Sequence, residues 1–190
     1  KVFFSVFCFL VFLNAFNMFD GINLQSSSYS IFIFLCILIF FINTLLIKIL
    51  LISLISFSYL NYKNKAFLGD SGSLLIAFII SYVFIKLYNL GFIDHADKVV
   101  IYMLVPGIDL IRLFFKRIYI KRNPLSSDRF HLHHLLLSKY SYKKTIIILT
   151  SLILLPIVMN FFGFNKLFII FFFILIYFIT LISTKTKNLN

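Results

Sequence analysis

The sequence predicts an all-α, polytopic integral membrane protein with about seven transmembrane helices and a site at its cytoplasmic face. Hydrophobic residues make up 62% of the 190 residues, and the mean hydropathy is +1.04. A soluble domain of this length cannot bury so much apolar surface. The apolar residues occur in long continuous runs between short polar segments, which is the pattern of membrane-spanning helices. We therefore treat residues 1–190 as one transmembrane domain.

Each crossing of a bilayer requires about 20 apolar residues. The run from Ile31 to Leu60 is almost unbroken, and as a single helix it would be about 45 Å long, against about 30 Å for the hydrocarbon core. We therefore divide it at Asn43 and Thr44. The predicted spans are Val2 to Phe19, Ser26 to Ile42, Thr44 to Leu60, Leu74 to Leu90, Val99 to Phe115, Thr145 to Phe162 and Leu167 to Ser183.

The basic residues support this division. With seven spans, all but five of the 18 Lys and Arg residues fall on or beside one side of the membrane. The positive-inside rule makes that side cytoplasmic. The five on or near the other side are Lys1, Lys48, Lys86, Lys98 and Lys166.

All six acidic residues are Asp. Asp94 and Asp97 lie in a short predicted external loop, where solvated loop residues are the simplest interpretation. The other four lie on or towards the cytoplasmic side with three of the four histidines. Ionisable groups at a membrane boundary are costly, so a cluster on one side indicates a functional site.

The first polar motif is NAFNMFDGINLQ, residues 14–25, at the end of the first span. Asn14, Asn17 and Asp20 are spaced three apart, so they form a polar stripe on one helix face. Such a stripe is typical of a cavity lining. The structural alternative is that Asn17 and Asp20 only end the helix before a turn at Gly21.

The second motif is FLGDSGSLL, residues 67–75. Its Gly-Asp-Ser-Gly core also surrounds the nucleophile of trypsin-like proteases, but their two β-barrels require alternating polar and apolar residues, which this sequence does not have. Asp70 lies between two glycines directly before an apolar helix, so it is suited to hold Mg²⁺ against phosphate oxygens. The structural alternative is that Asp70, Ser71 or Ser73 simply caps that helix.

The third motif is RNPLSSDRFHLHHLLL, residues 122–137, in the longest and most basic loop. His131, His133 and His134 stand close to Arg129 and suit the phosphates and sugar of a nucleotide. A zinc site is disfavoured, because no Cys or Glu accompanies them at a recognisable spacing. A third interpretation is a basic amphipathic segment that rests on anionic lipid.

These motifs, together with PGID at residues 106–109, occur in an order and at a spacing that resemble the polyprenyl-phosphate N-acetylhexosamine-1-phosphate transferases, glycosyltransferase family 4. The His-x-His-His form is similar to the branch that begins O-antigen and common-antigen chains. The phospho-MurNAc-pentapeptide transferases (lipid I synthases) are more distant relatives.

The resemblance implies transfer of a sugar 1-phosphate from a UDP-sugar to undecaprenyl phosphate, with release of UMP. It implies Mg²⁺ as cofactor, with Mn²⁺ as a substitute, and a multi-pass protein of the bacterial plasma membrane that contacts lipid and no nucleic acid. It makes Asp70 the metal ligand and Asp20 an essential acid near the diphosphate. The residues it assigns to substrate binding are Asn14, Asn17, Asn23, Asn61, Arg129, His131, His133 and His134.

The sequence departs from the family pattern in two ways. Asn23 stands where many relatives have a second acid, so this chain lacks that carboxylate. A pair of aspartates that the family carries upstream of the first motif has no counterpart in these residues. We therefore expect the 190 residues to be the C-terminal part of a longer enzyme and to lack full activity alone.

Two other classes of function are considered. An intramembrane serine protease would use Ser71 with a histidine base inside the membrane, whereas the candidate histidines lie in a basic loop. A transporter or lipid flippase would place polar groups near the bilayer midplane, whereas here they gather at one face.

Overall fold

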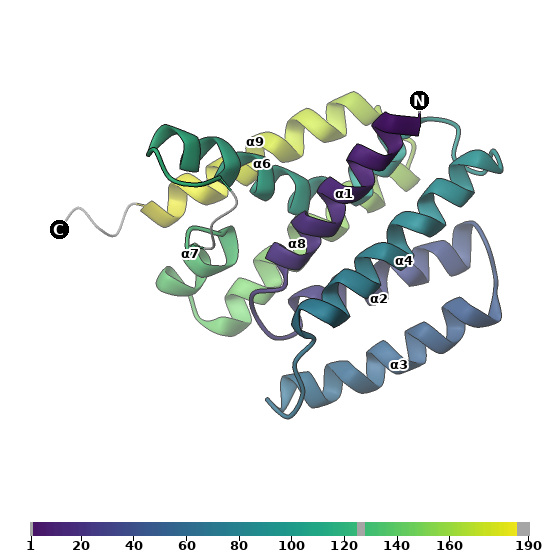
Figure 1. The fold of residues 1–190 in the computed structure, drawn as a ribbon, viewed down its shortest axis with the longest axis horizontal. Coiled ribbons are helices and arrows are strands. Elements are labelled where there is room, and N and C mark those ends of the chain that lie inside the picture. The colour runs from purple at the N-terminus through teal and green to yellow at the C-terminus, as the bar shows by residue number, and fades with distance from the viewer. Residues whose placement is uncertain (1, 125–127, 186–190) are drawn as a thin grey trace.

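The computed structural model describes residues 2–124 and 128–185, which fold mainly into α-helices (Figure 1). Their bounds are α1 Val2–Phe19, α2 Gln25–Phe40, α3 Leu45–Tyr62, α4 Gly69–Asn89, α5 Ala96–Tyr102, α6 Leu104–Tyr119, α7 Leu132–Lys139, α8 Tyr142–Phe161 and α9 Lys166–Lys185.

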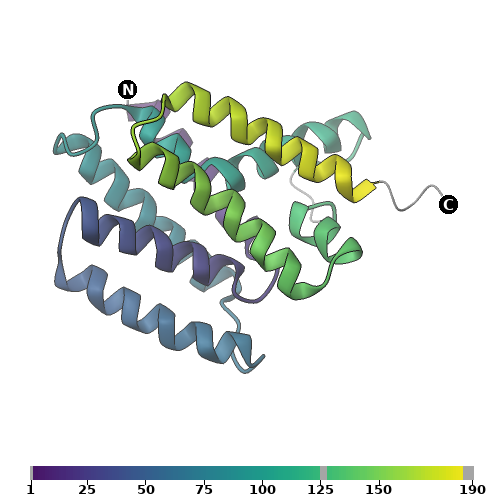
Figure 2. The same cartoon turned by 180° about the vertical axis from the view of Figure 1, so that it is seen from behind.

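The long helices form two layers. Helices α1, α4 and α6 lie together on the side that faces the viewer in Figure 1. Helices α2, α8 and α9 lie behind them and face the viewer in Figure 2, with α3 against α2 at the edge of the bundle. Because consecutive long helices run in opposite directions, the end of α1, the start of α2, the end of α3 and the start of α4 meet at one end of the bundle.

The division of the long apolar run is confirmed. Helix α2 ends at Phe40 and α3 begins at Leu45, so Asn43 and Thr44 lie in the connection between them. Two helices of 16 and 18 residues replace one that would exceed the thickness of the bilayer.

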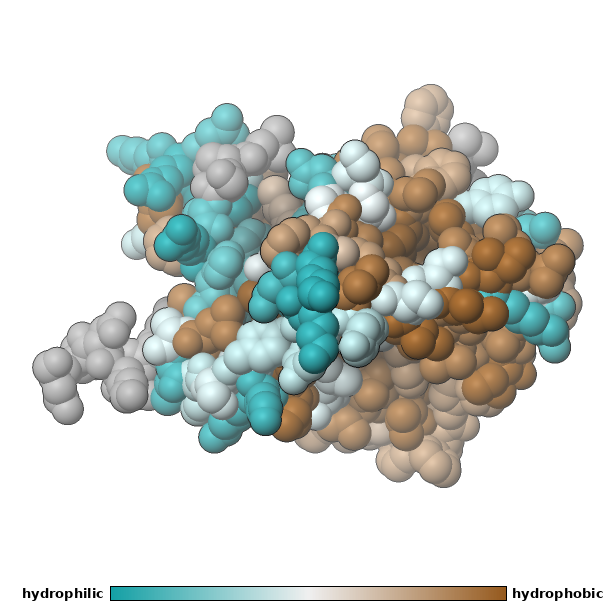
Figure 3. Space-filling view, turned by 90° about the horizontal axis from the view of Figure 1, so that it is seen from below, coloured by the Kyte–Doolittle hydropathy of each residue, from teal (hydrophilic) through white to brown (hydrophobic). Residues whose placement is uncertain are grey.

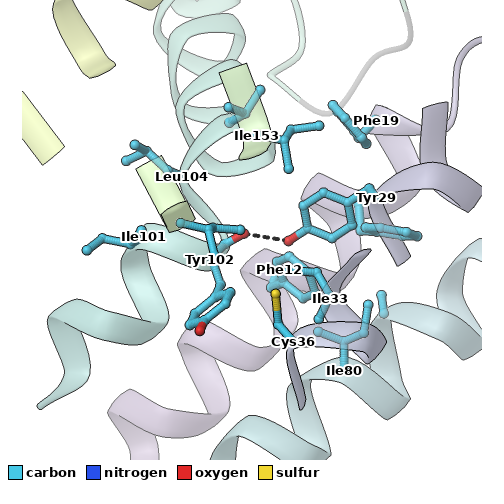
Figure 4. Packing of buried hydrophobic residues seen from close by; sticks show 14 of the residues in the cluster. Phe12, Phe19, Tyr29, Ile33, Cys36, Ile80, Ile101, Tyr102, Leu104 and Ile153 are labelled. Atoms are coloured by element: carbon cyan, nitrogen blue, oxygen red, sulfur yellow. Dashed lines mark hydrogen bonds between the residues drawn. The ribbon is translucent and has the colours of Figure 1, made fainter. Parts of the chain in front are cut away.

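The fifth predicted span, Val99 to Phe115, is wrong as a single helix. The chain breaks at Met103 into the short α5 and the longer α6. Pro106 explains the break, because proline has no N–H to donate to the carbonyl four residues earlier and its ring crowds that carbonyl. That carbonyl belongs to Tyr102, and it accepts a hydrogen bond of 2.7 Å from the Tyr29 hydroxyl of α2 instead (Figure 4).

Four of the described helices are long and apolar enough to cross a membrane: α3, α4, α8 and α9. The apolar stretches Ser5–Phe19 and Gln25–Phe40 are shorter. Helix α6 is amphipathic, with Asp109, Leu113 and Arg117 buried on one face. The described residues thus form an all-helical structure with four helices suited to span a membrane, while the count of about seven crossings stays a prediction.

The outer surface matches a protein in lipid at one end and in water at the other. Figure 3 shows hydrophobic side chains over one half of the molecule and hydrophilic ones gathered towards the end that carries α7 and the last turns of α6. Large apolar side chains are exposed along α3 and α9, among them Leu45, Ile52, Phe171 and Leu175. In water these faces would be unfavourable, whereas acyl chains cover them at no such cost.

Candidate functional site

The end of α1 and the start of α4 are joined by a hydrogen bond between their polar residues. The Ser73 hydroxyl donates to the Asn17 side-chain oxygen and also lies 3.1 Å from the Asp70 carbonyl. Ser73 is fully buried. This contact places the first turn of α4, with Asp70, beside the last turn of α1, which Asp20 directly follows.

Asp20 and Asp70 therefore face a common region. Burial raises the pKa of Asp20 above its ordinary value, and the negative charge of Asp70 raises it further. Asp70 itself is exposed in the first turn of α4. Gly69 before it has a φ of 64°, which glycine adopts without steric cost.

Asn14 does not join this group. Its side chain is exposed, and its amide nitrogen donates to the Leu10 carbonyl of its own helix at 2.8 Å. Of the predicted polar stripe, Asn17 and Asp20 thus reach the shared end of α1 and α4, while Asn14 bonds within α1.

Asn61, near the end of α3, contacts Asn23 in the loop between α1 and α2. The buried Asn61 amide nitrogen donates to the Asn23 oxygen at 3.2 Å and to the Ala66 carbonyl at 2.8 Å, while its oxygen accepts the Leu24 N–H at 2.7 Å. Leu24 has a φ of 66°, a conformation that is costly for a side chain other than glycine. Asn61 therefore holds a strained turn beside the site.

Two residues that the sequence analysis did not single out complete this loop. The Asn23 amide donates to the side-chain oxygen of Asn64, and the Tyr142 hydroxyl at the start of α8 donates to the Asn23 carbonyl at 2.6 Å. Asn64 was detectable as a polar residue close to Asn61, whereas Tyr142 carries no local signal of this contact.

Residues 131–134, here called the histidine segment, lie against the turn that follows α1. A Cβ atom built on Gly21 would lie 1.9 Å from His133 Nε2, so the imidazole ring touches the backbone at Gly21. The rings of His131 and His133 are stacked with centroids 5.5 Å apart, and those of His133 and His134 are 4.2 Å apart. The first and third sequence motifs are thus in contact.

His133 is kept neutral by its surroundings. It is 2% exposed, and burial, followed by the charges of His134 and His131, lowers its pKa to about 3. Its Nε2 has no hydrogen-bond partner within the described part of the chain. Burial also lowers the pKa of His134, and His131 and the exposed Arg129 nearby act in the same direction.

Helix α6 supplies the residues that hold the histidine segment in place. Arg117 donates from Nε to Asp128 at 2.7 Å and from Nη1 to the Pro124 carbonyl at 2.8 Å. Asp128 also accepts the Phe130 N–H at 2.8 Å. Burial raises the Asp128 pKa, but the hydrogen bonds and the charge of Arg117 prevail, so the net pKa is lowered.

Two charged residues earlier in α6, Asp109 and Arg112, also contact this segment. Arg112 Nη2 donates to Asp109 at 2.8 Å and to the Phe130 carbonyl at 2.7 Å, and Asp109 lies 2.8 Å from His131 Nδ1. Asp109 and Arg112 were visible as charges within a predicted span. What they contact was not visible from the sequence.

The donor set fits a magnesium ion that is also bound by a substrate. Among the described side chains, no three His, Cys, Asp or Glu residues lie close enough together to form a metal site of their own. Mg²⁺ commonly uses one or two carboxylates and takes its other ligands from phosphate oxygens and water. The neighbouring carboxylates of Asp70 and Asp20 are suited to such a partial site.

Residues 1–88 match the family model of glycosyl transferase family 4. The chain is 31% identical over 151 residues to the undecaprenyl-phosphate alpha-N-acetylglucosaminyl 1-phosphate transferase of Thermotoga maritima, covering 78% of this chain and 47% of the relative. It is 25% identical over 147 residues to the Escherichia coli K12 protein of the same name, covering 71% of this chain and 40% of the relative. No solved structure gives a significant match.

The chain thus spans less than half the length of these curated relatives. The family match contains the first two polar motifs, and the alignments cover more than two thirds of this chain. The chain is therefore similar to glycosyl transferase family 4, over residues 1–88 for the family model and over most of its length for these relatives.

Proposed function

We propose that this chain is part of an enzyme that transfers an N-acetylhexosamine 1-phosphate from a UDP-sugar to undecaprenyl phosphate and so begins a cell-surface polysaccharide. The names of the relatives support the lipid acceptor and the sugar-phosphate transfer. The observation that carries the proposal is the convergence at one end of the bundle: Asp20 is electrostatically coupled to Asp70, and His133 touches Gly21.

In the proposed reaction, a phosphate oxygen of the lipid forms a bond to the phosphorus that carries the sugar. The bond from that phosphorus to the bridging oxygen breaks, and UMP leaves with that oxygen. Negative charge moves between phosphates during this step, so fixed cations and hydrogen-bond donors are the main catalytic aid. Bound Mg²⁺ would supply further charge neutralisation.

Each group of site residues would have a separate role in this reaction. Asp70 would hold the metal ion beside the diphosphate, with Asp20 as the second carboxylate of that region. His131, His133, His134 and Arg129 would contact the phosphates and sugar of the donor. Asn17, Asn23 and Asn61 would shape the wall through the contacts that fix the ends of α1, α3 and α4.

The distribution of polar and charged residues supports a proposed location. Figure 3 shows hydrophilic side chains gathered towards one end of the molecule, and the predicted spans place most of the Lys and Arg residues on one side, as is typical of the cytoplasmic side. The proposed site therefore lies at the cytoplasmic face of a bacterial plasma membrane, where a water-soluble nucleotide sugar and a lipid phosphate can both reach it.

The test is release of UMP by the full-length membrane protein that contains this chain. We expect release from UDP-N-acetylglucosamine or a related UDP-sugar to require both Mg²⁺ and a polyprenyl phosphate. Asp70→Asn should abolish it, and the neighbouring exposed Ser71→Ala should not. UMP release that is retained in Ser71→Ala and lost in Asp70→Asn would exclude the protease, whereas lipid movement without UMP release would favour the flippase.

A further inference from the structure

Asp109 is the most heavily hydrogen-bonded side chain in the described part of the molecule. It lies on α6 and is 5% exposed. It contacts α6 itself through Arg112, α9 through Tyr177, and the start of α7 through His131 and Leu132. A buried carboxylate with this many donors, one of them a guanidinium, is ionised and acts only as an acceptor.

The two carboxylate oxygens have different partners. Oδ1 accepts from Arg112 Nη2 at 2.8 Å, from the Tyr177 hydroxyl and from the Leu132 N–H at 3.3 Å. Oδ2 faces His131 Nδ1 at 2.8 Å. Arg112 Nε also donates to the Tyr177 hydroxyl at 2.8 Å, so the donors around Oδ1 support one another.

This asymmetry has a chemical consequence for His131. Because Oδ2 can only accept, Nδ1 must carry the hydrogen between them. In the neutral ring, Nε2 is then left as a hydrogen-bond acceptor. The three donors at Oδ1 fix the orientation of the carboxylate, and the carboxylate fixes the tautomer of the imidazole.

We infer that Asp109 is the positioning residue of the histidine segment: it anchors the start of α7 and holds His131 in the Nδ1–H tautomer, with Nε2 left for a ligand. The inference rests on the proposed function, in which His131 contacts the sugar nucleotide. A neutral His131 held this way accepts a hydrogen bond from a hydroxyl or amide of the ligand and does not donate one to a phosphate.

The substitution Asp109→Asn tests this with little change of shape. The three donors around Oδ1 require an oxygen at that position, so the new amide group must turn its NH₂ towards His131 Nδ1. An NH₂ donates, which forces Nδ1 to accept and moves the hydrogen of His131 to Nε2. Tyr177→Phe removes one donor at Oδ1 and leaves Oδ2 as it was.

The measurement is the ¹⁵N spectrum of the full-length protein labelled at histidine, at a pH where His131 is neutral. The His131 signal is identified by its loss in His131→Gln. We expect the Nδ1–H tautomer in the wild type and in Tyr177→Phe, and the Nε2–H tautomer in Asp109→Asn. We expect UMP release to fall roughly 10- to 100-fold in Asp109→Asn, as when other orienting partners of histidine are removed.

A matched control is Asp94→Asn. Asp94 lies in the loop after α4 and pairs with Lys98 at 2.7 Å, so the same chemical change is made in another ion pair at the far end of α4 from Asp70. UMP release should be unchanged in this variant.

An Nε2–H tautomer in the wild type overturns the inference, and so does an unchanged tautomer in Asp109→Asn. If Asp109→Asn does not fold, the wild-type and Tyr177→Phe spectra still decide between the two tautomers. Failure of the proposed function is a separate result, because the wild type would then release no UMP while the spectra still report the state of His131.

Discussion

His133 Nε2 lies so close to Gly21 that a Cβ atom on this glycine would be 1.9 Å away. The contact joins the turn after α1 to the histidine segment more than 100 residues later in the chain. It exists because Gly21, the residue after Asp20, has no side chain.

Gly21→Ala is therefore expected to displace His133 and to reduce UMP release at least tenfold. A real Cβ does not approach another atom so closely, and the buried imidazole has little room to move. The assay is the initial rate in membranes at saturating substrates.

Gly107→Ala is the matched control for that change. A Cβ on Gly107 meets no atom within 4 Å, and alanine is favoured over glycine within a helix by up to about 1 kcal/mol. Equal losses of activity in the two variants would contradict the role given to the Gly21 contact.

Ser73→Ala should loosen the junction of α1 and α4. The change removes the hydrogen bond to Asn17 and leaves that half-buried amide oxygen without this donor, at a cost of roughly 1 kcal/mol. Thermal unfolding in detergent measures the loss, with Ser71→Ala at the exposed neighbouring position as control. The double variant Asn17→Ala/Ser73→Ala should lose less stability than the sum of the losses of the two single variants. Losses that add exactly would contradict the coupling between these residues.

Asp20→Asn should stabilise the protein at neutral pH while it reduces activity. The pKa of Asp20 is raised in the folded state, so between its ordinary pKa of 3.8 and the raised value the folded chain binds more protons than the unfolded one. Stability then falls as pH rises through that window, and ionised Asp20 is destabilising above it. The neutral amide removes this penalty, which a higher melting temperature would report.

The repulsion between the charges of Asp20 and Asp70 predicts a response to magnesium. A cation held by Asp70 beside Asp20 would offset the repulsion, so Mg²⁺ should raise the melting temperature of the wild type. The rise should be much smaller in Asp70→Asn. An equal rise in both proteins would place the ion elsewhere.

His133 should make the protein sensitive to acid. Its pKa is about 3 in the folded state against an ordinary 6.5, so between these values the unfolded chain binds more protons and stability falls as pH falls. Melting temperatures between about pH 7 and about pH 5.5 should decline less in His133→Gln than in the wild type. His95→Gln, at an exposed loop position, should follow the wild type; identical slopes in all three proteins would show that His133 does not titrate on unfolding.

The features that the sequence predicted correctly are local ones. Apolar run length and one polar interruption gave the helices on both sides of Asn43 and Thr44, because the length of a helix is limited by the thickness of the bilayer. The motif residues Asp20 and Asp70 were expected at helix ends and are found there. The break near Pro106 was open to local reasoning as well, since proline lacks the N–H that a continuous helix needs, but the hydrophobicity of the surrounding run concealed it.

What the sequence alone determined is where most of the apolar helices lie and which of their ends carry polar side chains, because the hydrogen bonds within a helix depend only on neighbours in the chain. What the tertiary structure decided is which polar groups meet. Asn14 bonds its own helix while Asn17 bonds α4, Tyr177 lies 68 positions from Asp109 yet donates to it, and His133 rests on Gly21. Those partnerships follow from how the helices cross and rotate, which side-chain packing across the whole bundle sets.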